Sequence, residues 1–498
     1  MTSTTTTLPT RSPSDLGVDA RGLLALVDGL EATPGVEPHG LVVVHRGAVV
    51  ARGWWAPYSA ERPHLVYSVS KSFTATAVGI AADEGLLTID DTVISWFPEL
   101  DAEVTDDRTR RMRLRHLLAM ASGHRTETLD RAETLDRAET LDPTNVVRGF
   151  LLTPPEAEPG SVFAYNQPCT YTLAEVVRRA SGATLVDYLR PRLLDPLGID
   201  VAAWQRDATG AELGYSGLHT TTDAVAALGQ LHLQQGRWGD EQLVSAAWVA
   251  EASRPHASTA HEGSADWQQG YGFQFWVSTH GYRADGAYGQ FSLVVPEHDL
   301  VVAITSQTTD TRALLDLVWA TVLPALGAGG SADDDARLAE RLGALTLPGV
   351  AAPTGDSPSG DDTTGGAETD SAPAAAGDTP AAGTWTAAPG GDQPGLTGVE
   401  VAVALDGAPT LTLVEGDHRL DAALGLGEWR TTGPLATWAE QHGDHLLVDV
   451  VFVETPHRLH LDADRGTGTV SARWRTAPLH GPDLRTLRAP GPDDVATR

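Results

Sequence analysis

The sequence predicts an α+β domain, in which an antiparallel sheet is flanked by helices, followed by a smaller all-β domain. Apolar, strand-like runs stand at both ends of residues 17–327, and helical patterns fill the stretch between them. Strand-like alternation returns at 396–490, after a long segment rich in Gly, Ala, Pro and Asp. Strands from both ends of one domain bury their apolar faces by meeting in one sheet, so the first domain is predicted to be layered.

The individual elements follow from apolar periodicity and from Gly and Pro punctuation. In the first domain, strands are predicted at 40–45, 48–54, 270–277, 291–295 and 300–305. Helices are predicted between and after them, at 21–31, 68–84, 112–123, 173–197, 222–234 and 313–326. In the second domain, strands are predicted at 399–405, 410–414, 446–453, 458–461 and 469–474.

The composition also sets the predicted domain boundaries. Residues 1–16 are rich in Thr, Ser and Pro and are predicted to be disordered. Residues 328–395 read as a helix followed by a disordered acidic linker. The role of the all-β domain at 396–490 stays open: it could cover the active site, mediate self-association or bind a ligand.

Charge and motif content narrow the class of partner. The net charge of −31 and the pI near 4.8 argue against nucleic acid and anionic membranes as partners. No signal-peptide pattern and no apolar run of the roughly 20 residues needed to span a bilayer are seen, so a cytoplasmic location is expected. No metal-binding or phosphate-binding motif is found, so no metal and no cofactor are expected. The expected partner is a small molecule, and homo-oligomerisation stays open.

Lys71 is the only lysine among the 35 Lys and Arg residues of the chain. A buried lysine can lose its proton and act as a base, whereas arginine stays charged. Ser68 stands three residues earlier at the start of a predicted buried helix, so the two side chains should share a face and meet. An isolated S-x-x-K is a weak motif, and chance survival of one lysine is the alternative.

A short tandem repeat interrupts the first domain. The hexad Arg-Ala-Glu-Thr-Leu-Asp at 131–136 recurs at 137–142. A period of six matches neither a helical heptad nor a known solenoid unit. We interpret it as an insertion without a function of its own, at the edge of the site that the domain builds.

Several stretches, in order, resemble one family. They are Tyr-Ser-Val-Ser-Lys at 67–71, Gly-Leu-Leu-Thr-Ile-Asp-Asp at 85–91, Arg-His-Leu-Leu-Ala-Met-Ala-Ser-Gly-His at 115–124, Pro-Gly-Ser-Val-Phe-Ala-Tyr-Asn at 159–166, Asp-Pro-Leu-Gly at 195–198 and Gly-Ala-Tyr-Gly-Gln at 286–290. Residues 17–327 thereby resemble the serine β-lactamase and penicillin-binding-protein superfamily, on the branch with class C β-lactamases, D,D-peptidases and family VIII carboxylesterases. This implies a β-lactamase/D,D-peptidase-like sheet with an inserted helical region. No G-x-S-x-G elbow points to an α/β-hydrolase instead.

The resemblance assigns roles to single residues. Ser68 would be the nucleophile, Lys71 its base partner and Tyr165 a second general acid/base. The backbone N–H groups of Ser68 and Ala287 would form the oxyanion hole. The substrate-binding positions would be Gln167, Asp285 and Gly286.

Two motifs depart from the family pattern. The usual Tyr-x-Asn reads Tyr165-Asn166-Gln167, so either the amide sits on Gln167 or the register differs. The usual Lys-Thr-Gly or His-x-Gly reads Ala-Asp-Gly at 284–286, so the cation that grips a substrate carboxylate is absent there. Arg283 is adjacent but would point to the other face of a strand.

Two hypotheses follow. The first is a serine hydrolase that cleaves an ester or small amide through a Ser68 acyl-enzyme, with an esterase favoured over antibiotic hydrolysis or D,D-peptidase activity because the cation is missing. The second is a binding or sensor protein that keeps the acylation fold without turnover. Product release distinguishes the two.

Overall fold

The computed structural model describes residues 8–129, 145–350, 382–405, 407–479, 483–491 and 494. The tandem repeat at 131–142 and most of the predicted acidic linker lie outside the described residues. The chain divides into two compact units. The first comprises 1–54, 60–344 and 489–498, and the second comprises 55–59 and 345–488.

The first unit is built on a six-stranded antiparallel sheet of order β2-β1-β11-β10-β9-β8. Its strands are β1 (Glu37–His45), β2 (Ala48–Trp54), β8 (Trp276–Val277), β9 (Tyr282–Gly286), β10 (Gln290–Val295) and β11 (Leu300–Gln307). Val43 of β1 lies opposite Val302 of β11, so both ends of the domain meet inside one sheet, as predicted. β1, β10 and β11 are buried along their whole length, which requires cover on both faces.

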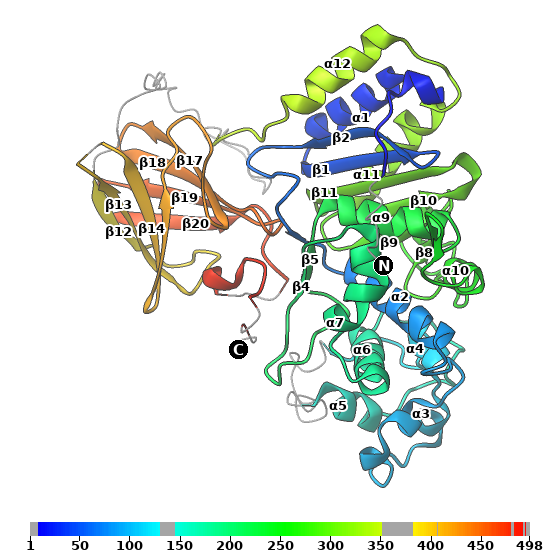
Figure 1. Cartoon of the computed structure of the whole chain (residues 1–498). Helices are drawn as coiled ribbons and strands as arrows, with labels where there is room; N and C mark the ends of the chain where they lie inside the picture. The colour runs from blue at the N-terminus through cyan, green and yellow to red at the C-terminus, as the bar shows by residue number, and fades with distance from the viewer. Residues whose placement is uncertain are drawn as a thin grey trace, which may run out of the picture. The chain divides into compact units, whose positions relative to one another are not determined.

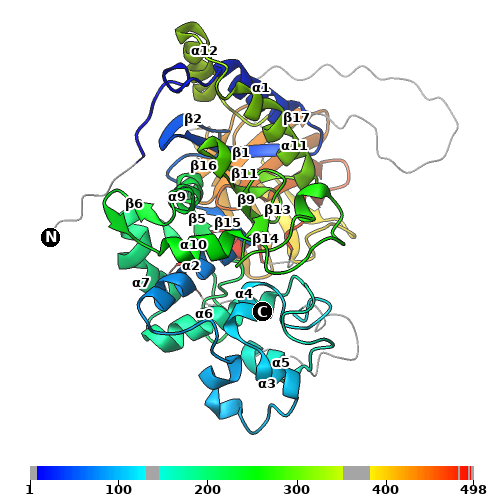
Figure 2. The same ribbon diagram turned by 90° about the vertical axis from the view of Figure 1, so that its right-hand side faces the viewer.

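Helices supply this cover in two layers (Figure 1). On one side lie α1 (Ala20–Ala32), α11 (Thr311–Thr321) and α12 (Ala332–Gly343), and on the other α9 (Thr222–Leu233) and α2 (Val69–Asp83). Figure 2 shows the same layering from the side, with α3 (Asp107–Arg111), α4 (Leu114–Leu118), α5 (Val146–Leu152) and α6 (Gln167–Ser181) below α2. The remaining helices of this unit are α7 (Leu185–Leu189), α8 (Asp195–Leu197) and α10 (Ala246–Ser253).

Short strands complete the first unit. A small three-stranded sheet contains β3 (His64–Leu65), which directly precedes α2, together with β4 (Ala202–Trp204) and β5 (Leu218–Thr220). A separate two-stranded sheet pairs β6 (Arg237–Trp238) with β7 (Glu241–Gln242). Helix α6 packs against α2, α4 and α5, so its N-terminal end reaches the middle of the domain. No helix among the described residues combines the length and the apolarity that crossing a membrane requires.

The second unit is a nine-stranded sheet of order β15-β14-β13-β12-β20-β19-β18-β17-β16. Its strands are β12 (Gly383–Ala387), β13 (Leu396–Val403), β14 (Pro409–Glu415), β15 (His418–Ala423), β16 (Arg430–Thr432), β17 (Leu435–His442), β18 (His445–Phe452), β19 (Arg458–Asp464) and β20 (Thr469–Trp474). Only the β12–β20 pair is parallel among these neighbours. Ala423 N of one edge strand donates to Thr432 Oγ1 of the other at 2.9 Å, so the sheet nearly closes into a barrel.

The described part of the N-terminus differs from the prediction. Residues 8–16 were expected to be disordered, but Arg11 N donates to Val49 O at 3.0 Å and Ser14–Leu16 form a 3-10 helix. The physical reason is that β2 is an edge strand, and its outer backbone groups offer partners even to a polar, Pro-containing segment. Composition alone does not reveal such pairing.

Strands β9 and β12 also differ from the prediction. β9 reads Tyr-Arg-Ala-Asp-Gly and was not among the predicted strands, because Tyr282 is its one large apolar residue, although four of its five residues are buried. β12 falls inside the predicted linker, and Trp385 is its one large buried side chain. The segment 55–59 joins the second unit through Tyr58, whose hydroxyl donates to Thr455 O at 2.9 Å.

Gly286 lets the end of β9 approach the start of α2 backbone to backbone. A Cβ at this position would lie 2.4 Å from Val66 O and 3.2 Å from Val69 N. Gly286→Ala is therefore expected to destabilise the protein by about 1–3 kcal/mol, because neither neighbour is a side chain that could move aside. Thermal unfolding measures this as a lowered Tm.

Gly343→Ala is the matched control, because a Cβ there meets no atom within 4 Å. Equal melting temperatures for Gly286→Ala and Gly343→Ala would contradict the close approach of β9 and α2.

Candidate active site

Ser68 lies at the N-terminal end of α2, where the chain makes a sharp turn. It is the N-cap residue, and the preceding Tyr67 has φ +47°, a left-handed conformation that is uncommon outside glycine. Ser70 stabilises this turn, because its Oγ donates to Tyr67 O at 2.5 Å and accepts from Leu218 N at 3.1 Å. Ser68 itself is partly exposed, whereas its neighbours Tyr67 and Val69 are buried.

Lys71 lies one turn further along α2 and is 1% exposed. Its Nζ donates to Ser68 Oγ at 3.0 Å, to Gln167 Oε1 at 2.5 Å and to Tyr215 O at 2.8 Å. Burial lowers the pKa of Lys71 to about 7, against the opposing charges of neighbouring acidic groups. The predicted meeting of Ser68 and Lys71 is present in the structure.

Tyr165 lies beside the same two residues. The Lys71 ammonium nitrogen is 4.7 Å from the centre of its ring, and the ring stacks on Trp276 at 5.9 Å between centroids. Desolvation raises the pKa of the Tyr165 phenol, while a hydrogen bond from Ser68 lowers it. The phenol is therefore protonated near neutral pH and within reach of the Ser68 hydroxyl.

The structure also shows which residue, Asn166 or Gln167, carries the side-chain amide that the family has in its Tyr-x-Asn motif. Gln167, the first residue of α6, accepts from Lys71, so its side-chain amide faces the Lys71 amine. Asn166 is fully buried and faces away, with its Oδ1 accepting from Thr128 N at 3.1 Å and Thr128 Oγ1 at 2.9 Å. The side-chain amide of the motif is thus carried by Gln167.

On β9, Arg283 and Asp285 share one face and form an ion pair. Arg283 Nε lies 2.9 Å from Asp285 Oδ2, and the Arg283 side chain is completely buried. Its guanidinium also lies 4.3 Å from the Trp267 ring centre. Burial raises the pKa of Asp285, and its charge acts on both Lys71 and Tyr165.

Ala287 lies in the turn after β9, directly after Gly286, whose backbone approaches that of Val66 and Val69. Tyr288 in this turn has φ +64°, and its ring makes an edge contact with Tyr67 at 5.3 Å between centroids. Gln290 fixes the turn, because its Nε2 donates to Ala287 O at 3.1 Å and to Ser306 O at 2.7 Å. Together with the close approach at Gly286, these contacts hold the turn against the start of α2.

Glu127 and Tyr215 belong to the site but were not predicted from the sequence. Tyr215 contributes a backbone carbonyl, for which no side-chain pattern exists. Glu127 accepts from Gln167 N at 3.2 and 3.0 Å and acts electrostatically on Lys71. No sequence pattern pointed to this contact, because it is made with a backbone amide; the hexad at 125–130, Arg-Thr-Glu-Thr-Leu-Asp, shows only that the repeat begins one unit earlier.

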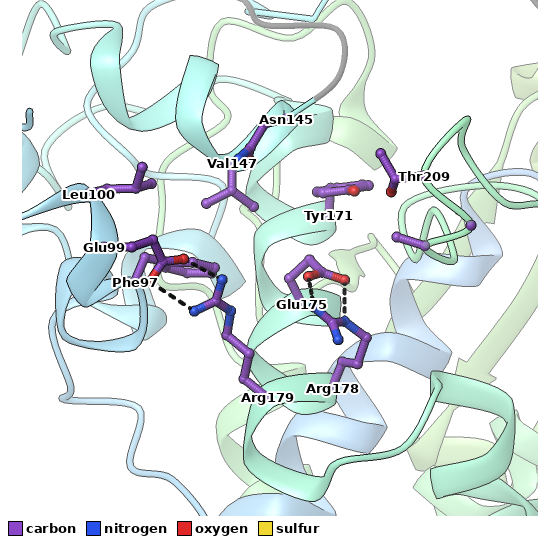
Figure 3. A pocket seen from close by; sticks show the side chains of 12 residues that line it. Phe97, Glu99, Leu100, Asn145, Val147, Tyr171, Glu175, Arg178, Arg179 and Thr209 are labelled. Atoms are coloured by element: carbon purple, nitrogen blue, oxygen red, sulfur yellow. Dashed lines mark hydrogen bonds and ion pairs between the residues drawn. The ribbon is translucent and has the colours of Figure 1, made fainter.

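A separate cavity of about 350 Å³ lies further along α6 (Figure 3). Its charged residues pair with one another, Arg178 with Glu175 and Arg179 with Glu99. The lining residues are Phe97, Glu99, Leu100, Asn145, Val147, Tyr171, Glu175, Arg178, Arg179, Thr209, Gly210 and Ala211. Ser68, Lys71 and Tyr165 are not among them. Within the described part of the chain, no group of three or more His, Cys, Asp or Glu side chains could hold a metal ion.

Comparisons with known proteins bear on the family. The sequence model of the Beta-lactamase family matches residues 24–325. The 6-aminohexanoate-dimer hydrolase of Paenarthrobacter ureafaciens is 26% identical over 285 residues, 54% of this chain and 72% of that protein. Lovastatin esterase of Penicillium rubens is 30% identical over 148 residues, 26% of this chain and 37% of that protein.

Among solved structures, EstCE1, described as a hydrolase with promiscuous acyltransferase activity, superposes with a TM-score of 0.50 at 20% identity. It covers 60% of this chain and 99% of its own. The predicted fold is thereby confirmed, and so is the predicted enzyme class, since the named relatives are hydrolases. More than half of the sequence matches the family, and the chain belongs to the Beta-lactamase family.

Proposed function

We propose that this enzyme cleaves an ester or a small amide through a covalent Ser68 acyl-enzyme. The observation that carries the proposal is the position of the Lys71 amine, 3.0 Å from Ser68 Oγ in a buried environment. A serine hydroxyl becomes a good nucleophile only when a neighbouring base takes its proton.

The hydrogen bonds around Lys71 suit the neutral amine. Gln167 Oε1 and Tyr215 O can only accept, so they take the two N–H groups of a neutral amine. The charged amine donates to Ser68 Oγ, whereas the lone pair of the neutral amine would face Ser68 Oγ and accept its proton. With a pKa of about 7, a large fraction of Lys71 is in this state at neutral pH.

The proposed reaction proceeds in two stages. Ser68 Oγ attacks the carbonyl carbon while its proton passes to Lys71, and the backbone N–H groups of Ser68 and Ala287 stabilise the oxyanion. Collapse of the tetrahedral intermediate breaks the bond to the alcohol or amine, which takes a proton from Tyr165. Water then gives a proton to the Tyr165 phenolate and attacks the acyl carbon, and collapse of the second tetrahedral intermediate releases the acid while Lys71 returns its proton to Ser68 Oγ.

The charges of the site favour a substrate without a required carboxylate. Position 284 is alanine, and the adjacent cation, Arg283, is fully buried and paired with Asp285. The proposal therefore places this chain nearer to an esterase than to a β-lactamase or D,D-peptidase. The named relatives, one a lovastatin esterase and one a 6-aminohexanoate-dimer hydrolase, are compatible with either bond type.

The nucleophile is tested with Ser68→Ala and Lys71→Arg, assayed on short-chain p-nitrophenyl esters with intact-mass analysis. Both variants are expected to lose at least a thousandfold in kcat/KM, because one lacks the nucleophile and the other cannot act as a base. Ser95→Ala, which changes an exposed serine, should behave as wild type.

An active Lys71→Arg variant would disprove the base role. Wild-type protein that accumulates a stable acyl adduct without turnover would instead indicate a binding or sensor protein.

The pH dependence tests the same base. Lys71 must be neutral to accept a proton, so the pH profile of kcat/KM should have an acidic limb with its midpoint near pH 7. Below this pH, kcat/KM should fall about tenfold for each pH unit. Above the limb, the rate should be level until Tyr165 loses its proton, which burial delays beyond the ordinary range of a phenol. A rate that is flat from pH 5 to 8 would contradict the low pKa of Lys71.

Substrate charge is tested by comparing an ester with a chromogenic cephalosporin, which carries a carboxylate. We expect ester turnover that depends on Ser68 and a kcat/KM for the cephalosporin at least a hundredfold lower, because no exposed cation stands at position 284. Comparable turnover of both substrates would refute the inference drawn from Ala284 and the Arg283–Asp285 pair.

A further inference from the structure

Glu127 is fixed at the N-terminal end of α6 by backbone amides from two parts of the chain. Both of its carboxylate oxygens accept from Gln167 N, at 3.2 and 3.0 Å. Its Oε1 also accepts from Thr128 N and Leu129 N, each at 2.9 Å. Charge-assisted bonds to several amides hold a carboxylate in one place, and the N-terminal end of a helix favours a negative charge.

The residue that Glu127 holds is the one that contacts the catalytic lysine. Gln167 gives its backbone N–H to Glu127 and its side-chain oxygen to Lys71 Nζ, at 2.5 Å. Next to it, Thr128 binds Asn166 through two hydrogen bonds of 3.1 and 2.9 Å. The two residues at 127–128 therefore clamp the two residues at 166–167 and fix the point where α6 meets Lys71.

We propose that Glu127 is a positioning residue of the catalytic site, which holds Gln167 against Lys71 and sets the charge around the Lys71 amine. The inference rests on the proposed function, because it assigns Glu127 a role in preparing the base that activates Ser68. It also gives a role to a residue of the hexad at 125–130, which differs from the two repeated hexads that follow it only at its second position.

The charges that face Lys71 come from several elements. Glu127 contributes the largest charge effect on the Lys71 pKa and raises it, and Asp285 of β9 acts in the same direction. Cys169 of α6 is also close, but burial raises the pKa of its thiol to about 12, so it is uncharged near neutral pH. Asp285 is partly neutralised by Arg283, 2.9 Å away. Tyr165 is uncharged near neutral pH because its pKa is raised by burial. Loss of the Glu127 charge should therefore leave the ammonium form of Lys71 less stable.

The test measures the rate at which a fluorophosphonate labels Ser68 as a function of pH, followed by intact mass. In this reaction the Ser68 oxygen forms a bond to phosphorus, fluoride leaves, and the serine proton passes to Lys71. Glu127→Gln should move the acidic limb to lower pH by about half to one unit. Well below the limb, labelling relative to the plateau then rises about 3- to 10-fold.

Glu127→Asp and Glu133→Gln are the matched variants. The first keeps the charge but shortens the reach to Gln167 N, so the plateau should fall while the limb stays in place. The second makes the same substitution at the same position of the next hexad, and its profile should match that of wild type. If Glu127→Gln does not fold, Glu127→Asn removes the charge at the same length as Glu127→Asp.

Each outcome bears on one of the two proposals. A limb that moves for Glu127→Gln but not for Glu127→Asp supports the assignment, whereas a purely structural role would lower the plateau of both without moving either limb. Identical limbs for Glu127→Gln and wild type, or an equal shift for Glu133→Gln, would overturn it while leaving the Ser68 nucleophile intact. Absence of Ser68 labelling in wild type at every pH would overturn the proposed function, and this inference with it.

Discussion

The site depends on a single buried amine. Removing an ammonium from water costs several kcal/mol unless its charge is compensated, so the protein must either pair Lys71 or allow it to become neutral. Two uncharged acceptors and one serine hydroxyl surround its Nζ, and the carboxylates act on it only through space. This arrangement leaves the two protonation states close in energy near neutral pH. Arginine would remain charged in the same environment, which explains why a chain that otherwise uses arginine has a lysine here.

A second constraint is the backbone on either side of Ser68. Tyr67 and Tyr288 both adopt left-handed conformations, and their rings contact each other. Such conformations cost about 1–3 kcal/mol each in residues other than glycine and persist only where surrounding contacts enforce them. Here the contacts are the bonds made by Ser70 and Gln290, together with the close approach at Gly286. These contacts thus stabilise the left-handed backbone conformations of Tyr67 and Tyr288.

The sequence predicted the central sheet because buried strands and helices leave strong periodic patterns, as at 40–54, 291–305 and 222–234. It missed β9 and β12, because each has only one large apolar residue, Tyr282 in β9 and Trp385 in β12. Ser68, Lys71, Tyr165 and Gln167, which the motifs singled out, lie close together in the structure. Glu127 was missed because it acts through a backbone amide, and such a contact depends on tertiary structure rather than on residue spacing.

The sequence Ala-Asp-Gly at 284–286 replaces the family's usual Lys-Thr-Gly or His-x-Gly. The charges around the site explain why this replacement need not signal a loss of activity. Arg283 is held by Asp285, by Ser278 and by Trp267, so it supports the strand from within instead of gripping a ligand. A substrate carboxylate brought to this region would meet the charges of Asp285 and Glu127 without an exposed cation from β9 to offset them. In a site of low polarity such repulsion is large, whereas a neutral acyl group meets none of it. Under the proposed mechanism, the residues that would activate Ser68 are all present, and the difference from the family pattern concerns only the cation that would bind a substrate carboxylate.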